Sequence, residues 1–216
     1  DVRDLATGRL IASRQLLPPP TAGRVSRFQT CLQVAGDLVL VGEPGEPTSA
    51  YELDTLRPRW TSDLDLSTVF VSATCGPVLC AFGRGGGVRA LDVSTGRLRW
   101  SSQRLTYARS YAHVLVALAE RPDRSEPPVL EVVDARTGYP MRDLGPWRLT
   151  AGTGAPPLAI RHDAASMRAW VGTLDPDVRA VRPLGVLPDI VDGCEAGSGW
   201  VMCRHLDASI GLWRFG

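Results

Sequence analysis

The residues best suited to chemistry are five cysteines, four of which form two closely spaced pairs. Cys75 and Cys80 flank a Gly-Pro turn, whereas Cys194 and Cys203 flank a Gly-Ser-Gly turn. Each pair lies across an expected hairpin, where opposite Cβ atoms come within about 4.5–5.5 Å, near the range that a disulfide accepts. We predict the disulfides Cys75–Cys80 and Cys194–Cys203. Because disulfides persist in oxidising compartments, we also expect an extracytoplasmic location, secreted or membrane-anchored.

Other interpretations of these cysteines remain open. The sequence also fits five buried thiols in a cytosolic protein. Paired cysteines can bind zinc, although the spacings Cys-x4-Cys and Cys-x8-Cys are not the usual ones for that metal, and only His205 lies close to a pair. Cys31 has no partner in this scheme, and we expect it to be buried and unreactive.

The remaining candidates for catalysis do not converge in the sequence. His113, His162 and His205 fall in different repeats, and no Gly-x-Ser-x-Gly elbow precedes a helix. The glycine-rich segment 83–87 lies between two expected strands, so it lacks the helix N-terminus that follows a phosphate cradle. We therefore interpret the histidines as ordinary strand or loop residues and this segment as a linker. We assign no catalytic, cofactor-binding or metal-binding residue.

The elements that must position these residues follow a repeat of about forty residues. The clearest copy is the turn that contains Asp92, Thr95 and Gly96, between two segments of alternating apolar residues. Aspartate accepts hydrogen bonds from N–H groups two residues on, and glycine takes a positive φ without steric cost. Further copies of the turn contain Asp4, Thr7 and Gly8, and Asp134, Thr137 and Gly138. Degenerate copies are centred on Asp54, where the turn is shorter, and on Asp175.

Two apolar strands precede most of these turns, at residues 30–41, 74–82, 110–118 and 193–203. A unit therefore contains two buried strands, a polar linker, a third strand, the turn and an outer strand. This order predicts an all-β fold, a β-propeller of about five four-stranded antiparallel blades in a single domain over residues 1–216. The outer strand 9–13 and the C-terminal strand 210–215 would share one blade and close the ring.

Composition agrees with this fold class and argues against two kinds of partner. Glycine (22) and proline (17) are abundant, and both disfavour helices. The net charge is +1 and the 24 basic residues are scattered arginines, so we expect no nucleic-acid partner. No run of about 18 apolar residues exists, so a membrane would be reached only through a segment absent from this chain. Because the chain starts with Asp1 rather than Met, we expect a processed form or part of a longer, membrane-anchored protein.

The pattern Ala90-Leu91-Asp92-x-x-Thr95-Gly96-x-x-x-Trp100 resembles the repeat of the PQQ-like β-propellers. We interpret the chain as a divergent bacterial member of that superfamily, which includes quinoprotein dehydrogenases and the propeller of the outer-membrane protein assembly lipoprotein. Trp60 and Trp100 occupy positions where the repeat predicts packing between blades; stacking on a quinone is the alternative role.

Two functions follow from this interpretation. The first is a non-catalytic extracytoplasmic binding, scaffolding or sensor domain that presents loops to a protein or small-molecule partner. The alternative is a PQQ-dependent oxidoreductase, for which the resemblance implies a calcium site and adjacent cysteines. The sequence contains no asparagine and no adjacent cysteine pair, so we expect no bound cofactor. A lyase or hydrolase site built from acidic residues in a central channel is a third hypothesis.

Overall fold

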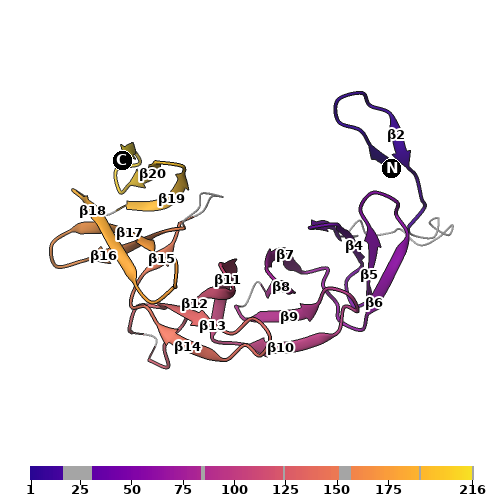
Figure 1. The fold of residues 1–216 in the computed structure, drawn as a ribbon, viewed down its shortest axis with the longest axis horizontal. Coiled ribbons are helices and arrows are strands. Elements are labelled where there is room, and N and C mark those ends of the chain that lie inside the picture. Colours follow the sequence, from indigo (N-terminus) through magenta and orange to yellow (C-terminus); the bar gives the residue numbers. More distant parts are fainter. Residues whose placement is uncertain (17–30, 84–85, 124, 151–156, 190, 216) are drawn as a thin grey trace. The chain divides into compact units, whose positions relative to one another are not determined.

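The computed structural model describes residues 1–16, 31–83, 86–123, 125–150, 157–189 and 191–215. These residues form strands and turns without any helix (Figure 1), so none of them belongs to a helix that could cross a membrane. They divide into two compact units. Unit 1 comprises Asp1–Gln103 with Ala135–Gly138, and unit 2 comprises Arg104–Asp134 with Tyr139–Gly216.

Unit 1 contains two four-stranded antiparallel sheets and one short hairpin. Its strands are β1 (Val2–Arg3), β2 (Leu10–Ala12), β3 (Cys31–Ala35), β4 (Leu38–Gly42), β5 (Thr48–Glu52), β6 (Pro58–Ser62), β7 (Val69–Cys75), β8 (Val78–Gly83), β9 (Val88–Asp92) and β10 (Leu98–Ser102). Both sheets follow chain order, from β3 to β6 and from β7 to β10, while β1 pairs with β2. The β1–β2 hairpin packs Val2 and Ala12 against Val39, Val41 and Leu56.

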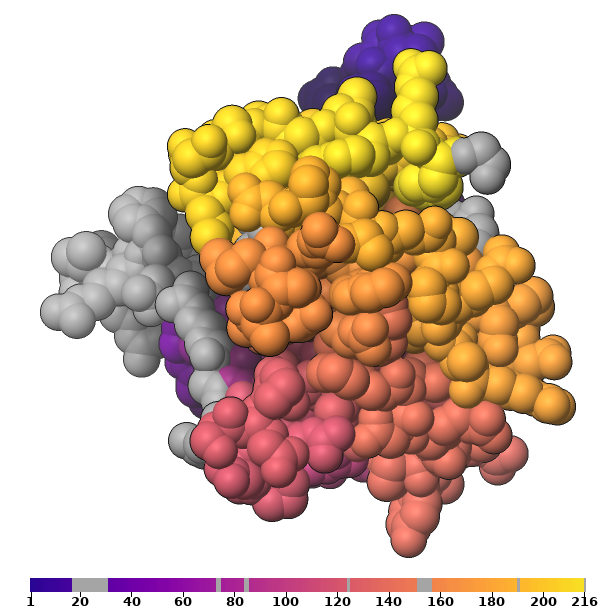
Figure 2. Space-filling model, turned by 90° about the vertical axis from the view of Figure 1, so that its left-hand side faces the viewer, coloured from indigo at the N-terminus to yellow at the C-terminus, as the bar shows by residue number. Residues whose placement is uncertain are grey.

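Unit 2 contains two four-stranded sheets and one three-stranded sheet, all in chain order. Its strands are β11 (Leu105–Tyr111), β12 (Val114–Ala119), β13 (Val129–Val133), β14 (Pro140–Asp143), β15 (Arg148–Leu149), β16 (Leu158–Asp163), β17 (Arg168–Leu174), β18 (Val181–Leu187), β19 (Val191–Gly197), β20 (Trp200–His205) and β21 (Ile210–Arg214). The three-stranded sheet β19–β21 lies at the surface (yellow in Figure 2), where Leu206, Ile210 and Leu212 are exposed.

In three of the four-stranded sheets the second strand is heavily buried, because other parts of the protein cover both of its faces. All five residues of β4 are buried, as are the first four of β8 and of β12. The core of unit 1 contains Leu38 and Leu40 of β4 together with Val71, Leu79 and Leu91 of the following sheet. These apolar runs therefore form the doubly covered strands that the sequence predicts.

The structure confirms an all-β fold built from four-stranded antiparallel sheets. Among the described residues, four sheets are complete, one has three strands and one has two. The outer strand expected at 9–13 is the shorter β2. No ladder between described residues joins β2 to β21, so closure of a ring and a single domain over 1–216 stay predictions.

The Gln33 side chain connects the two sheets of unit 1, because its amide makes hydrogen bonds to the main chain of β7 like those of a neighbouring strand. Its Oε1 accepts a hydrogen bond from the Val71 N–H at 2.8 Å, and its Nε2 donates to the Val69 carbonyl at 2.7 Å. β7 is the first strand of its sheet, so these main-chain groups lie on an edge that carries no neighbouring strand of the same sheet. Val71 is buried, so water does not replace the amide.

We expect Gln33→Leu to lower the free energy of unfolding by about 1–3 kcal/mol, because it leaves a buried N–H and a carbonyl of β7 without partners. Urea denaturation measures the loss. The control Val34→Ala changes an exposed neighbour on the same strand and should stay within about 0.5 kcal/mol of the parent. Equal effects of the two substitutions would contradict this account of Gln33.

Candidate functional site

The carboxylate of Asp92 is fully engaged within its own turn. Its Oδ1 accepts hydrogen bonds from the N–H and hydroxyl groups of both Ser94 and Thr95, at 2.6–3.1 Å. Its Oδ2 accepts from the Arg99 guanidinium. The Ser94 hydroxyl and then Arg99 are the main groups that lower the pKa of Asp92 far below its usual range. This carboxylate stabilises the turn and is a poor proton donor.

The other complete copies use the same geometry where their contacts are described. Asp4 accepts hydrogen bonds from the N–H and hydroxyl of Thr7, both at 2.7 Å. Gly8, Gly96 and Gly138 have φ of 70°, 68° and 73°, the left-handed conformation that glycine adopts without strain. Asp134 donates its N–H to the Tyr139 carbonyl at 3.0 Å, closing the turn that contains Thr137.

The interpretation of the degenerate copy around Asp54 is wrong. The carboxylate that accepts the Thr55 hydroxyl, at 2.6 Å, belongs to Glu52, and Arg59 also pairs with it. The turn has the ordinary length, and Leu56 takes the glycine position with φ 54°. Leu56 is buried in an apolar cluster, and this burial offsets the cost of a left-handed leucine. Asp175, in the weakest copy, accepts the Arg179 N–H at 2.6 Å.

The indole rings of Trp60 and Trp100 rest on the turn glycines of other repeats. Trp60 donates its Nε1–H to the Val93 carbonyl at 2.8 Å, and its ring lies against Gly96. Trp100 donates to the Ala135 carbonyl at 3.0 Å, and a Cβ on Gly138 would lie 2.6 Å from its ring. With Trp100 only 8% exposed, this ring is not open for stacking on a cofactor.

We expect the Asp92 turn to make stability depend on pH. Because the folded pKa lies below the unfolded value of about 3.9, the carboxylate contributes stability above about pH 5 and loses it as the pH falls. Asp92→Asn should therefore be less stable than the parent at pH 7, and the difference should shrink on acidification. Urea denaturation at several pH values measures this. Asp54→Asn is the control and should follow the parent throughout; the same shrinkage in that control would contradict the assignment.

The structure contains both predicted disulfides. Cys75–Cys80 spans the β7–β8 hairpin with a Cα–Cα distance of 5.9 Å, and Cys194–Cys203 links β19 to β20. Cys31 is a free thiol. It is half-buried rather than fully buried as expected, and its sulfur accepts a hydrogen bond from Gln33 Nε2.

The histidines lie apart, as their positions in the sequence suggest. His113 is in the turn after β11 and His162 is exposed on β16. His205 ends β20, where its Nδ1 lies 3.5 Å from Asp189 and its ring contacts Trp213. Within the described part of the chain, no three His, Cys, Asp or Glu side chains gather in a way that could hold a metal ion.

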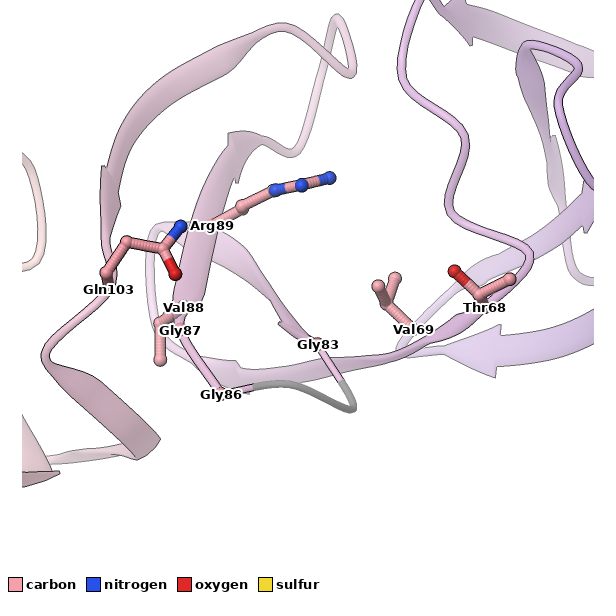
Figure 3. Close-up of a pocket in the computed structure, with 8 residues that line it drawn as sticks. All are labelled: Thr68, Val69, Gly83, Gly86, Gly87, Val88, Arg89 and Gln103. Carbon is pink, nitrogen blue, oxygen red and sulfur yellow. The ribbon is translucent and has the colours of Figure 1, made fainter.

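A cavity of about 360 Å³ in unit 1 lies beside the β8–β9 loop. Its walls come from three separate places in the chain: residues 68–69 at the start of β7, Gly83, Gly86 and Gly87 with the beginning of β9, and the residue after β10 (Figure 3). The lining residues are Thr68, Val69, Gly83, Gly86, Gly87, Val88, Arg89 and Gln103. Its volume falls in the lower part of the range of small-molecule sites.

Among the described residues that line the cavity, those with polar side chains are Thr68, Arg89 and Gln103. Along β9, Val88 and Ala90 are buried and Arg89 is exposed, so Arg89 projects toward the segment between β6 and β7 (Figure 3). None of these three side chains makes a hydrogen bond or an ion pair with the described residues. Groups that can donate hydrogen bonds and have no internal partner are the usual polar component of a ligand site.

From the sequence, segment 83–87 is interpreted as a linker, and the cavity beside it is not predicted. Arg84 and Gly85 lie outside the described residues. The described residues on either side of them are joined by hydrogen bonds from the Gly86 N–H to the Gly83 carbonyl and from the Gly83 N–H to the Gly87 carbonyl. The sequence does contain one signal of this cavity: Arg89 follows a glycine-rich loop and lies on a strand between two buried residues.

Comparison with known proteins shows likeness of fold only. No family model and no curated protein matches the chain. A eukaryotic initiation factor structure is 13% identical, with a TM-score of 0.59 over 86% of this chain and 52% of that one. A complex of KlAtg21 with the coiled coil of AgAtg16 is 9% identical, with a TM-score of 0.53 over 83% and 64%. BamB from Moraxella catarrhalis is 11% identical, with a TM-score of 0.38 over 85% and 82%.

These solved structures are propeller-like folds. The chain spans only about half to two thirds of the first two. The all-β sheets of four antiparallel strands are consistent with a propeller, and the likeness extends no further than that architecture.

Proposed function

We propose that this protein is a non-catalytic extracytoplasmic binding or scaffolding domain that recognises its partner through loops. The observation that carries the proposal is that the side chains of the repeat have internal contacts, whereas polar side chains near the loops do not. The turn carboxylates and the tryptophans of the repeat are occupied by internal contacts, whereas Thr68, Arg89 and Gln103 beside the β8–β9 loop are not. Propeller-like folds commonly use loops at one face for recognition.

An extracytoplasmic location is supported by the two disulfides, because reducing compartments keep such thiols reduced. A protein partner is supported by one similar structure, a complex of KlAtg21 with the coiled coil of AgAtg16. Because the identity is only 9%, that likeness supports a protein as the class of partner and no particular protein.

Site-specific photo-crosslinking in cells of the source organism tests the proposal. A photoreactive residue replaces Gln103 or Thr68 at the cavity, or Thr61 on the outer strand β6 as the control. We expect one discrete adduct that is shared by the two cavity positions and absent from Thr61. The absence of adducts at both cavity positions, or the same adducts at Thr61, would overturn the proposal.

Adding PQQ and calcium to the purified protein distinguishes the binding domain from the alternative, a PQQ-dependent oxidoreductase. A binding domain should form no stoichiometric complex and reduce no dye with an alcohol or sugar. The covered ring of Trp100 supports that expectation. A tight complex with dye reduction would replace the binding role by an oxidoreductase.

We also propose that the chain forms one ring, in which β2 completes the sheet that ends with β21. Leu10 and Ile11 of β2 and Ile210 and Leu212 of β21 are exposed apolar residues on short or terminal strands, which closure would cover. Spin labels at Ile11 and Ile210 should report a single short distance. A broad distribution of long distances would contradict closure.

A further inference from the structure

We infer that the cavity beside Arg89 binds a small molecule, or the end of a chain, that carries one carboxylate. This inference rests on the proposed binding function and names the ligand class of its site. The occupant would place its carboxylate on the Arg89 guanidinium and its neighbouring polar group near Gln103 and Thr68.

Arg89 is arranged for a charged ligand. Its side chain extends from β9 across the cavity toward Thr68 and Val69 on the far wall (Figure 3). It makes no ion pair and no hydrogen bond with the described residues. The guanidinium is planar and always charged, and its parallel N–H groups match the two oxygens of a carboxylate.

Two neutral side chains flank this cation. The Gln103 amide lies against Gly87, where a Cβ would come within 3.0 Å of its Oε1. Gly87 has φ 90°, a left-handed conformation that favours glycine. The Thr68 hydroxyl lies on the opposite wall (Figure 3). Together they offer donors and acceptors for an amide or hydroxyl beside a carboxylate.

The local charge favours an anion with a single charge. Asp65 is close enough to interact electrostatically with Arg89. Its own oxygens already accept hydrogen bonds from the Gly45 N–H and from the N–H and hydroxyl of Ser67. These contacts, led by the Ser67 hydroxyl, lower the pKa of Asp65, so it is ionised at neutral pH. Among the residues that the structure describes there, one cation beside one fixed carboxylate suits a monoanion and disfavours a phosphate dianion.

The volume limits the size of the ligand. About 360 Å³ is small for a ligand site, and the wall residue Val88 offers little surface because it is buried. The cavity therefore suits one residue-sized unit, such as a single amino acid, a sugar acid or the last residue of a peptide.

The test is a titration of the ¹⁵N-labelled protein, followed by NMR at constant ionic strength. The probes are N-acetylalanine, its uncharged amide N-acetylalaninamide, and inorganic phosphate. We expect N-acetylalanine to shift the signals of the Gln103 side-chain amide and the Gly87 N–H saturably. N-acetylalaninamide should not saturate, and phosphate should bind more weakly than N-acetylalanine.

Arg89→Gln should weaken N-acetylalanine binding by about tenfold or more, because it removes a charge-assisted contact. The matched control is Arg97→Gln, which removes an exposed turn arginine of the same unit and should leave binding unchanged. Arg89→Lys provides a second variant that keeps the charge and loses the planar geometry, and it should bind with intermediate affinity. Unchanged thermal unfolding in each variant shows that the fold is intact.

Equal binding by the parent and Arg89→Gln would overturn the inference, as would tighter binding of phosphate or shifts confined to residues away from the cavity. The proposed function is judged separately, by photo-crosslinking. Adducts at Gln103 without saturable N-acetylalanine binding would reject the carboxylate assignment and leave the binding role in place.

Discussion

Replacing Trp100 with alanine is expected to lower the free energy of unfolding by about 3–5 kcal/mol, the usual cost of deleting a large buried aromatic side chain. The ring is 8% exposed, covers Gly138 and donates a hydrogen bond to the Ala135 carbonyl at 3.0 Å. Its deletion leaves a cavity and also an unpaired carbonyl. Urea denaturation, monitored by far-ultraviolet circular dichroism, measures the loss.

Two further variants separate the parts of this effect. Trp100→Phe keeps an aromatic ring and loses the indole N–H, so it should cost less than alanine does. Trp60→Ala should also cost less than Trp100→Ala, because Trp60 is only partly buried while making the same type of contact. A loss below about 1 kcal/mol for Trp100→Ala would show that the ring contributes little.

Loss of the disulfides is the second large effect. Replacing either pair with alanine should cost about 2–3 kcal/mol, because each bridge closes a short loop of the unfolded chain. The parent should therefore unfold at a lower urea concentration when a reductant is present. Denaturation with and without dithiothreitol measures this difference.

Cys31→Ala is the matched control for the disulfides. Cys31 is a free thiol, so its replacement should leave the response to reductant unchanged. Under denaturing, non-reducing conditions the parent should show one reactive thiol among its five cysteines. Five reactive thiols would contradict the disulfides and remove the support for an extracytoplasmic location.

Much of the fold can be predicted from the sequence because it depends on local chemistry. The Asp92 turn, its glycine and the alternating strands around it involve residues within one hairpin. The disulfides are also local, since Cys75 and Cys80 lie across a single tight turn. Short-range geometry of this kind leaves a direct signature in residue spacing.

The features that the sequence analysis misses depend on distant parts of the chain. Leu56 takes a left-handed conformation that glycine usually adopts, and its packing against Val39 and Val41 offsets the conformational cost. The sequence does not reveal the cavity beside Arg89 for a related reason: Thr68 and Gln103 come from connecting segments elsewhere in the chain, before β7 and after β10. Gln33 likewise acts on β7, in the next sheet.

We propose that loops carry recognition, whereas the repeated residues join one repeat to another. A double-mutant cycle between Trp100→Ala and Gly138→Ala tests it most directly, because a Cβ on Gly138 would lie 2.6 Å from the Trp100 ring. We predict that Gly138→Ala is strongly destabilising in the parent. In the Trp100→Ala background, Gly138→Ala should lower the free energy of unfolding by only about 1 kcal/mol, the cost of placing alanine in the left-handed conformation. The same cost for Gly138→Ala in both backgrounds would contradict the contact and the structural role assigned to the repeat.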